Sequence, residues 1–165
     1  MAKLVLVRVD TRLVHGQTVT KWRSARNVDK YIIVDETLAK DKFMADFYKL
    51  SAPKGTKVEI ISQDEAIKRW NENEFGDDGN VGLIFKNIEN GYQLYKKGFP
   101  KYFEFMVGNC VATKGSVAVT KAIYITPAEY EMLKELKADG IDVYFKLTPD
   151  FTSVPLDSVA SKFNK

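Results

Sequence analysis

The stretch KLVLVRVDTRLVHGQTVTKW, residues 3–22, begins with an apolar run and ends in a segment of helical length. Residues 3–9 lack the strict alternation of a half-exposed strand, so they predict a strand that is buried on both faces. A polar loop follows, and Gly16 and Gln17 then open the predicted helix. A buried strand that leads through a short loop into a helix is the repeating unit of parallel α/β sheets.

The same unit recurs along the first two thirds of the chain. Further buried strands are predicted at residues 30–35, 57–62 and 81–86, and helices at residues 38–52, 63–75 and 88–98. This alternation predicts a parallel sheet with right-handed crossovers. In residues 38–52, the apolar face of a single amphipathic helix is predicted from side chains that recur at helical spacing: Leu38, Phe43, Phe47 and Leu50.

In the last third of the chain, the predicted strands and helices no longer alternate regularly. Residues 102–109 and 116–120 suggest a short strand pair. Thr126 and Glu129 form a predicted capping box with Pro127 in the first turn, and Gly140 ends that helix. Residues 141–147 predict a final strand, and residues 148–165, with two prolines and weak periodicity, predict a loosely attached tail. Residues 1–165 are therefore expected to form a single α/β domain.

Composition excludes several classes of protein. The 25 Lys and Arg and 22 Asp and Glu leave a net charge of only +3, which is too small and too evenly spread to indicate a nucleic-acid partner. The lone Cys110 and the absence of paired Cys or His motifs argue against a disulfide or a metal site. The initial apolar run is too short for a signal peptide, and no segment is long enough to span a membrane. We therefore expect a cytoplasmic protein.

His15 is the only histidine in the chain, and it follows the first strand. Ligands of open α/β sheets bind beyond the carboxyl ends of the strands, where free N–H groups at a helix start attract anions. Arg12 can donate to two phosphate oxygens, and Asp10 can orient Arg12 or the imidazole. The phosphate-binding backbone is expected at Gly16 and Gln17, where a glycine permits close approach.

These parts suit a histidine that holds a phosphoryl group, with no metal required. Two alternatives remain open from the residues alone. His15 could be an ordinary hydrogen-bonded surface residue. The loop could also belong to a noncatalytic regulatory module that binds a phosphorylated small molecule without being modified.

The first motif resembles the signature of the IIB subunit of the mannose/fructose/sorbose family of phosphoenolpyruvate-dependent sugar phosphotransferase systems. The residues that match this signature are Asp10, Arg12, His15, Gly16, Gln17 and Trp22. Supporting similarity lies in DETLAKD, LIFKNIENGYQLYKKG, FMVGN and AIYITPAEYEMLKELKADGIDVY, at residues 35–41, 83–98, 105–109 and 122–144.

The resemblance implies an open, mainly parallel sheet of about seven strands with helices on both faces. It implies that His15 accepts a phosphoryl group, on Nδ1, from the phosphohistidine of a IIA protein. His15 then passes it to a hexose or amino sugar held by the membrane IIC/IID subunits, which makes the chain a protein-Nπ-phosphohistidine–sugar phosphotransferase. No cofactor is implied, association with the membrane complex is expected to be peripheral, and a homo-oligomer is compatible with the family.

A few other polar residues end strands at the same predicted edge. Asp35 could face the crevice, but an acidic residue before a helix is more often an N-terminal cap. Lys86 could help to neutralise phosphate, although a solvated lysine is the commoner case. Asn109 stands where the broader family often has a second glycine, and it resembles the branch that serves N-acetylgalactosamine. Trp22 is expected to pack in the core beside Val19.

Overall fold

The computed structural model of the chain describes residues 2–14, 17–76 and 79–164. Its strands in chain order are β1 (Lys3–Val9), β2 (Lys30–Val34), β3 (Lys57–Ile61), β4 (Asn80–Phe85), β5 (Glu104–Val107), β6 (Val117–Thr120), β7 (Ile123–Ile125), β8 (Asp142–Phe145) and β9 (Val154–Pro155). Its helices are α1 (Gln17–Arg26), α2 (Glu36–Ala39), α3 (Lys42–Ser51), α4 (Gln63–Asn73), α5 (Ile88–Lys96), α6 (Pro127–Ala138) and the 3-10 helix η1 (Leu156–Lys162).

Seven of the strands form one sheet in the order β3-β2-β4-β1-β5-β8-β9. All neighbouring pairs are parallel except β8 and β9. Strand β1 lies at the centre, and it pairs with β4 along its whole length but with β5 only at Arg8↔Met106 and Val9↔Val107. The predicted α/β class and mainly parallel sheet of about seven strands are confirmed.

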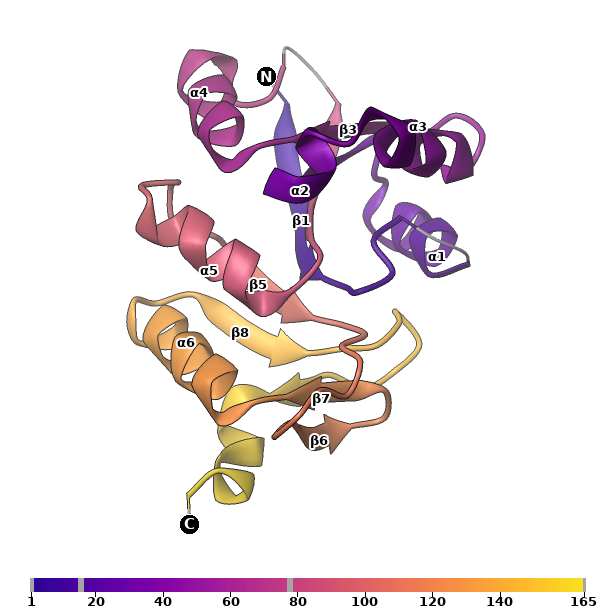
Figure 1. Cartoon of the computed structure of the whole chain (residues 1–165). Helices are drawn as coiled ribbons and strands as arrows, with labels where there is room; N and C mark the ends of the chain where they lie inside the picture. Colours follow the sequence, from indigo (N-terminus) through magenta and orange to yellow (C-terminus); the bar gives the residue numbers. More distant parts are fainter. Residues whose placement is uncertain (1, 15–16, 77–78, 165) are drawn as a thin grey trace.

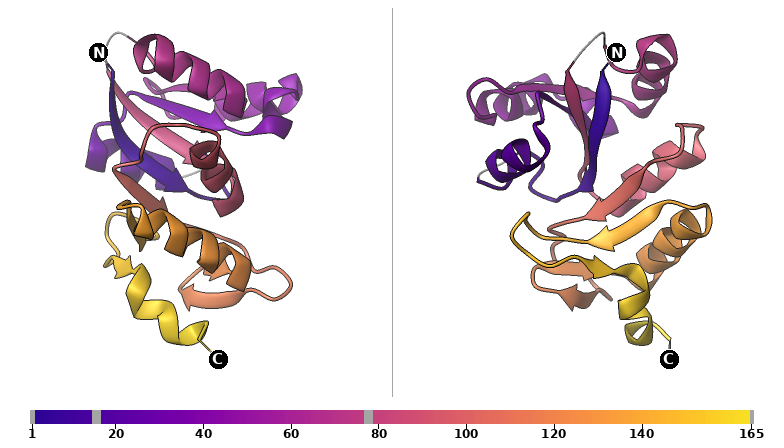
Figure 2. Two further views of the ribbon diagram at one scale, coloured as in Figure 1. Left: turned by 90° about the vertical axis from the view of Figure 1, so that its left-hand side faces the viewer. Right: turned by 180° about the vertical axis from the view of Figure 1, so that it is seen from behind.

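Helices cover both faces of the sheet (Figure 1). On one face, Val19 and Trp22 of α1 and Met44 of α3 belong to one apolar core. On the other face, Leu94 of α5 and Leu133 of α6 belong to a second, larger core, which α4 also joins. Figure 2 shows the same layers from two further sides, with β9 and η1 at the end of the molecule away from α3.

The predicted start of the last long helix is confirmed in atomic detail. The Thr126 hydroxyl accepts the Glu129 N–H at 3.1 Å, and the Glu129 carboxylate accepts the Thr126 N–H at 2.8 Å. Pro127 occupies the first turn, where its missing N–H costs no hydrogen bond. Gly140, with φ of 91°, follows the C-cap in a conformation that favours glycine.

Residues 38–52 do not form the single helix that the periodicity predicts. The chain breaks between α2 and α3, and Asp41 caps α3 by accepting the Met44 N–H at 3.1 Å. The break changes the phase of the apolar side chains, so that Met44 and Tyr48 pack against the core. Of the residues predicted to form the apolar face, Leu38 is buried, and those that are exposed are Phe43, Phe47 and Leu50.

The strand pair predicted from residues 102–109 and 116–120 is wrong. Strand β5 is buried along its entire length and pairs with β1 and β8 inside the main sheet. Strand β6 pairs instead with β7, which follows it, in a separate antiparallel pair. A fully buried strand needs neighbours on both edges, which a short hairpin does not provide.

The loose attachment predicted for residues 148–165 is wrong, because residues 148–164 are packed on the domain. Strand β9 pairs with β8, which is therefore not the last strand of the sheet. Leu156 and Val159 are fully buried, and the ring of Phe163 stacks on that of Tyr130 with centroids 4.4 Å apart. These apolar side chains supply the attachment that the weak periodicity concealed. No helix in the described parts of the chain is long and apolar enough to cross a membrane.

Candidate functional site

The candidate site lies at the carboxyl end of the central strand β1. The connection that leaves β1 leads to α1 on one face, whereas those that leave its neighbours β4 and β5 lead to α5 and α6 on the other. Connections that diverge in this way open a crevice at the sheet edge, where α/β proteins bind their ligands. The loop of residues 10–14 leaves β1 at this crevice, as the sequence predicts.

Hydrogen bonds fix this loop to both neighbouring strands. The Asp10 N–H donates to the Phe85 carbonyl at 2.9 Å, at the end of β4. Thr11 donates from its N–H at 2.8 Å and from its hydroxyl at 3.0 Å to the Asn109 carbonyl, just after β5. The loop is therefore held rigidly at the centre of the sheet edge.

The loop ends in a strained turn directly before His15. The Leu13 N–H donates to the Asp10 carbonyl at 3.0 Å, and Leu13 has φ of 57°, in the left-handed region. This conformation costs a residue other than glycine about 1–2 kcal/mol. Leu13 and Val14 are both buried in the core beneath α1, and this burial offsets the strain.

Asp10 is the centre of a network of charged groups. Its side chain is buried, and one oxygen, Oδ1, accepts the Arg12 backbone N–H at 2.9 Å and Arg12 Nε at 3.3 Å. The other oxygen, Oδ2, accepts Arg8 Nη2 at 3.1 Å and Arg12 Nη2 at 3.4 Å. One carboxylate thus binds two guanidinium groups. The Arg12 side chain is 40% exposed and that of Arg8 only 2%, so Arg12 is the cation that faces solvent.

Arg8 is a member of this network that the sequence reasoning missed. Its guanidinium donates to the carbonyl oxygens of Lys146 at 2.7 Å and Leu147 at 2.6 Å, and its Cζ lies 4.8 Å from the centroid of the Trp22 ring. Burial lowers the pKa of Arg8, and the adjacent Asp10 carboxylate opposes this effect. An arginine inside an apolar strand, two residues before Asp10, was the available signal, because a buried cation requires a partner.

Gly108 makes room for the Arg8 guanidinium. A Cβ atom at position 108 would lie 2.1 Å from Arg8 Nη2 and 2.4 Å from Cζ. The close approach at this glycine is therefore made by a side chain of the protein itself. The neighbouring Asn109 donates from its amide to the Ala122 carbonyl at 3.4 Å and holds the loop after β5 against β7.

Asp10 and Arg12 are brought together as the sequence predicts. His15 and Gly16 lie outside the described residues, and Gln17 is described only as the first residue of α1. The first N–H groups of a helix have no partners within the helix, so α1 presents donors toward the segment that precedes it. Trp22 is buried in the core, as expected.

Two other candidates at strand ends, Asp35 and Lys86, differ in what the structure shows of them. Asp35 is buried and caps α2 by accepting the Leu38 N–H at 2.9 Å, and it also accepts Asn90 Nδ2 at 3.2 Å. This outcome agrees with the reading of Asp35 as a helix cap. Lys86 is exposed at the end of β4.

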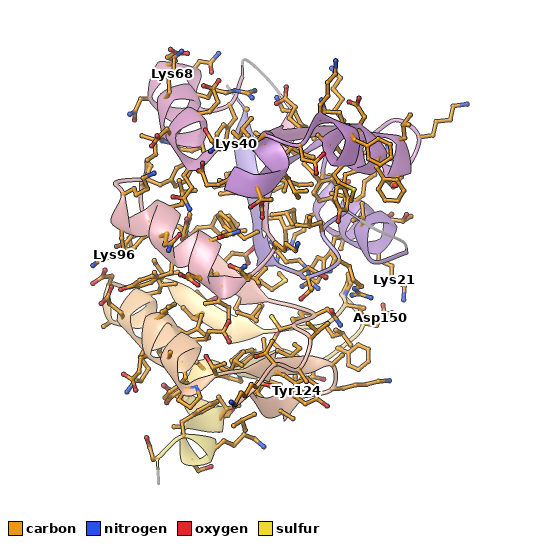
Figure 3. The ribbon with its side chains drawn as sticks, viewed as in Figure 1. Lys21, Lys40, Lys68, Lys96, Tyr124 and Asp150 are labelled. Atoms are coloured by element: carbon orange, nitrogen blue, oxygen red, sulfur yellow. The ribbon has the colours of Figure 1, made fainter. Side chains whose placement is uncertain are left out.

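A surface ion pair joins α1 to the loop that carries the carbonyl partners of Arg8. Lys21 Nζ and Asp150 Oδ2 are 3.2 Å apart, and Figure 3 shows the two side chains facing each other. Both side chains are substantially exposed, at 46% and 72%. Exposed pairs of this kind contribute little stability, so the buried Arg8 contacts are the stronger connection between β1 and this loop.

Comparisons with known proteins identify the family. Residues 4–165 match the family model described as the phosphotransferase system sorbose subfamily IIB component. The sorbose-specific EIIB component of Lacticaseibacillus casei is 30% identical over 84% of this chain and 83% of that protein. The mannose-specific EIIAB component of Escherichia coli K12 is 26% identical over 97% of this chain but only 49% of that protein.

Solved structures agree with this assignment. The crystal structure of manxB from Thermoanaerobacter tengcongensis is 31% identical, with a TM-score of 0.90, over 100% of this chain and 99% of that one. The IIBSor domain of the sorbose permease from Klebsiella pneumoniae has a TM-score of 0.87 at 24% identity, over 96% and 97% of the two chains, and shows the shared fold. The chain belongs to the sorbose subfamily of phosphotransferase system IIB components.

Proposed function

We propose that His15 is the residue through which this IIB component carries the phosphoryl group. A IIB component is a phosphotransferase that receives phosphate from IIA and passes it to a sugar. The observation that carries the proposal is the buried Asp10 carboxylate, which fixes both the backbone and the guanidinium of Arg12 three residues before the only histidine of the chain. Nothing in the comparisons favours the alternative of a noncatalytic regulatory module.

Arg12 is suited to stabilise the charge of the transferring group. Asp10 holds Arg12 through Nε and Nη2, and the side chain remains 40% exposed, so the guanidinium can also donate to phosphoryl oxygens at the protein surface. A planar guanidinium pairs with two such oxygens at once. The backbone at Gly16 and Gln17 would supply further donors at the start of α1.

The reaction consists of two exchanges at one imidazole nitrogen. In the first, the N–P bond of phosphohistidine in IIA breaks and an N–P bond to His15 forms. In the second, that bond breaks and an O–P bond forms to a sugar hydroxyl, whose proton passes to the imidazole that is released. Arg12 acts in both directions, because it stabilises the charge on the phosphoryl oxygens whichever bond is breaking.

The partners follow from the same reading. The donor is a IIA protein, and one relative, the E. coli mannose component, is named as a IIAB protein. We propose that the acceptor sugar is held by membrane IIC/IID subunits and that this chain visits them from the cytoplasmic side. Each partner must leave after transfer, so both contacts are expected to be transient.

The test is to detect the phosphoryl adduct directly. Wild type and His15→Gln are incubated with phosphoenolpyruvate, the general phosphotransferase proteins and a mannose-family IIA, and then measured by intact mass and peptide mapping. We expect a single acid-labile adduct on the wild-type peptide that contains His15 and none on the variant. Asp150→Asn, on an exposed side chain, serves as the control that must still accept the group. An adduct at another residue, or none with a IIA that phosphorylates a known IIB, would reject the proposal.

A further inference from the structure

The outer surface of α3 carries three large apolar side chains that are more than half exposed. Phe43, Phe47 and Leu50 recur at helical spacing and are 80%, 53% and 86% exposed. On the inner side of the same helix, Met44 and Tyr48 pack against the core beneath α3. The apolar stripe is therefore additional to what holds the helix in place, and an exposed stripe of this kind marks an interaction surface.

The stripe lies in a basic segment of the chain. Residues 40–57 contain five lysines and two aspartates, a surplus that equals the net charge of +3 of the whole protein. These lysines are all exposed, and within residues 2–14, 17–76 and 79–164 none of them forms an ion pair. The lysines are Lys40, Lys42, Lys49, Lys54 and Lys57.

We propose that α3 docks this protein onto the surface of a membrane that contains anionic lipids. Phe43, Phe47 and Leu50 would enter the boundary between head groups and acyl chains, as the apolar face of an interfacial helix does. The lysines beside them would reach the negatively charged head groups through their flexible stems. This inference rests on the proposed function, because a carrier that delivers to membrane subunits works at such a surface.

A second copy of this chain fits the surface poorly. A symmetric dimer would place the same basic segment opposite itself, so that five lysines would face five lysines. Three side chains on a helix of ten residues also cover much less than the roughly 800 Å² per partner of a stable interface.

The cytoplasmic loops of membrane subunits are also a poor match. Such loops carry an excess of lysine and arginine, so they would repel a basic surface. Anionic lipid head groups complement both the charge and the apolar stripe.

The position of α3 suits the transfer reaction. The segment that contains α3 leaves the carboxyl end of β2, and the loop of residues 10–14 leaves the carboxyl end of β1, at the same edge of the sheet. Helices α1 and α3 cover the same face. Docking through α3 would therefore hold the start of α1 near the bilayer surface while leaving the sheet edge open to partners.

The test measures binding of the unphosphorylated protein to vesicles by co-sedimentation. Vesicles of phosphatidylcholine mixed with phosphatidylglycerol are compared with vesicles of phosphatidylcholine alone, at low and high salt. The test variant is the triple change Phe43→Ser, Phe47→Ser, Leu50→Ser. The matched control is the pair Phe103→Ser and Phe151→Ser, which removes exposed rings elsewhere, at 50% and 41% exposure.

We expect wild type and the control to bind the anionic vesicles and the triple variant to bind at least about tenfold more weakly. Salt should weaken the wild-type binding. The inference is overturned if wild type stays in solution, if the triple variant binds as well as wild type, or if neutral vesicles are bound equally. It is also overturned if wild type is a dimer that the triple variant dissociates, which would show that a second copy covers the stripe.

The same variants separate this inference from the proposed function. Without vesicles, the triple variant should accept the phosphoryl group from IIA at the wild-type rate, because α3 is not part of the phosphoryl site. Loss of vesicle binding with normal phosphorylation supports the docking surface. Absence of an adduct in wild type would instead reject the role of His15 and leave the vesicle result unchanged. A triple variant that loses phosphoryl acceptance while folded would assign α3 to IIA contact and overturn the lipid inference.

Discussion

Two buried carboxylates lie at opposite ends of the strands: Asp10 follows the carboxyl end of β1, and Glu104 is the first residue of β5. Each binds an arginine that stacks on Trp22. Arg8, bound to Asp10, lies 4.8 Å from the Trp22 ring centroid, and Arg26, bound to Glu104, lies 5.7 Å from it. The composition of the two clusters is thus almost the same. Only the one at the carboxyl edge of the sheet adjoins the proposed phosphoryl site.

The difference lies in the third partner. Glu104 accepts the Tyr144 hydroxyl at 2.6 Å and the Val7 N–H at 3.1 Å, and both of these donors belong to strands of the sheet. Asp10 instead holds Arg12, whose side chain is 40% exposed. Arg26 is also partly exposed, at 28%, so what distinguishes the Asp10 cluster is that its exposed arginine lies three residues before His15.

The largest effect is expected at the carboxylate of the proposed site. Asp10→Asn leaves the Arg8 guanidinium buried without its counter-charge, so the free energy of unfolding should fall by about 3–5 kcal/mol. Urea denaturation measures this loss. If Asp10→Asn is as stable as wild type, Arg8 is satisfied by the Lys146 and Leu147 carbonyls alone and the network does not depend on Asp10.

Arg12 should affect transfer much more than stability. Arg12→Lys retains a positive charge but loses the planar donor pair, so phosphoryl transfer from IIA should slow about ten- to a hundredfold, with the free energy of unfolding changed by less than about 1 kcal/mol. Rapid-quench measurement of the His15 adduct gives the rate. Unchanged rates would remove Arg12 from the reaction, and a large loss of stability would make it a structural residue like Arg8.

The Glu104 cluster should show the opposite behaviour. Tyr144→Phe removes one hydrogen bond to Glu104, so the free energy of unfolding should fall by about 1 kcal/mol while transfer stays at the wild-type rate. A change in transfer would contradict the division between the two clusters.

The same variant should also alter the alkaline pH dependence of stability. Burial, together with the hydrogen bond to Glu104, raises the pKa of Tyr144 above its ordinary value of 10. Its contribution is therefore present below pH 10 and lost as the unfolded chain ionises at higher pH. Urea midpoints should fall more steeply above pH 10 in wild type than in Tyr144→Phe, and parallel curves would contradict this assignment.

The smallest effect is expected at the surface pair between α1 and the loop after β8. Asp150→Asn breaks the contact with Lys21, in which both partners are exposed, so stability should change by less than about 0.5 kcal/mol and should depend little on salt. Urea denaturation at low and high salt measures it. A loss as large as that of Tyr144→Phe would mean that this pair, and not only Arg8, ties the loop to the rest of the domain.

Local patterns predicted those features of the fold that depend on neighbours in the sequence. Buried strands and the Thr126 cap were predicted because apolar runs and capping residues act over a few positions. The predicted apolar face of residues 38–52 is wrong because the chain breaks before the Asp41 cap and a new helix begins there. The side chains of α3 that face the core are therefore not those expected from one continuous helix. The partners of β5 were wrong because pairing between strands depends on contacts far apart in the chain.

The candidate site divides in the same way. Asp10 and Arg12 are two residues apart, so their contact could be expected from the sequence. The position of Arg8 inside an apolar strand indicates a buried cation, but its carbonyl partners at Lys146 and Leu147 could not be assigned, because they are more than a hundred residues away in the chain. Only the finished sheet brings β1 and the end of β8 close enough for one side chain to reach both.

Because position 108 has no side chain, the residues that are allowed at positions 8 and 108 depend on each other. While Arg8 occupies the space where a Cβ would stand, alanine at position 108 is excluded. A shorter residue at position 8 would remove that restriction. In a library that varies both positions, glycine at 108 should therefore be retained wherever arginine is present at 8, so that two residues a hundred positions apart are inherited as a pair.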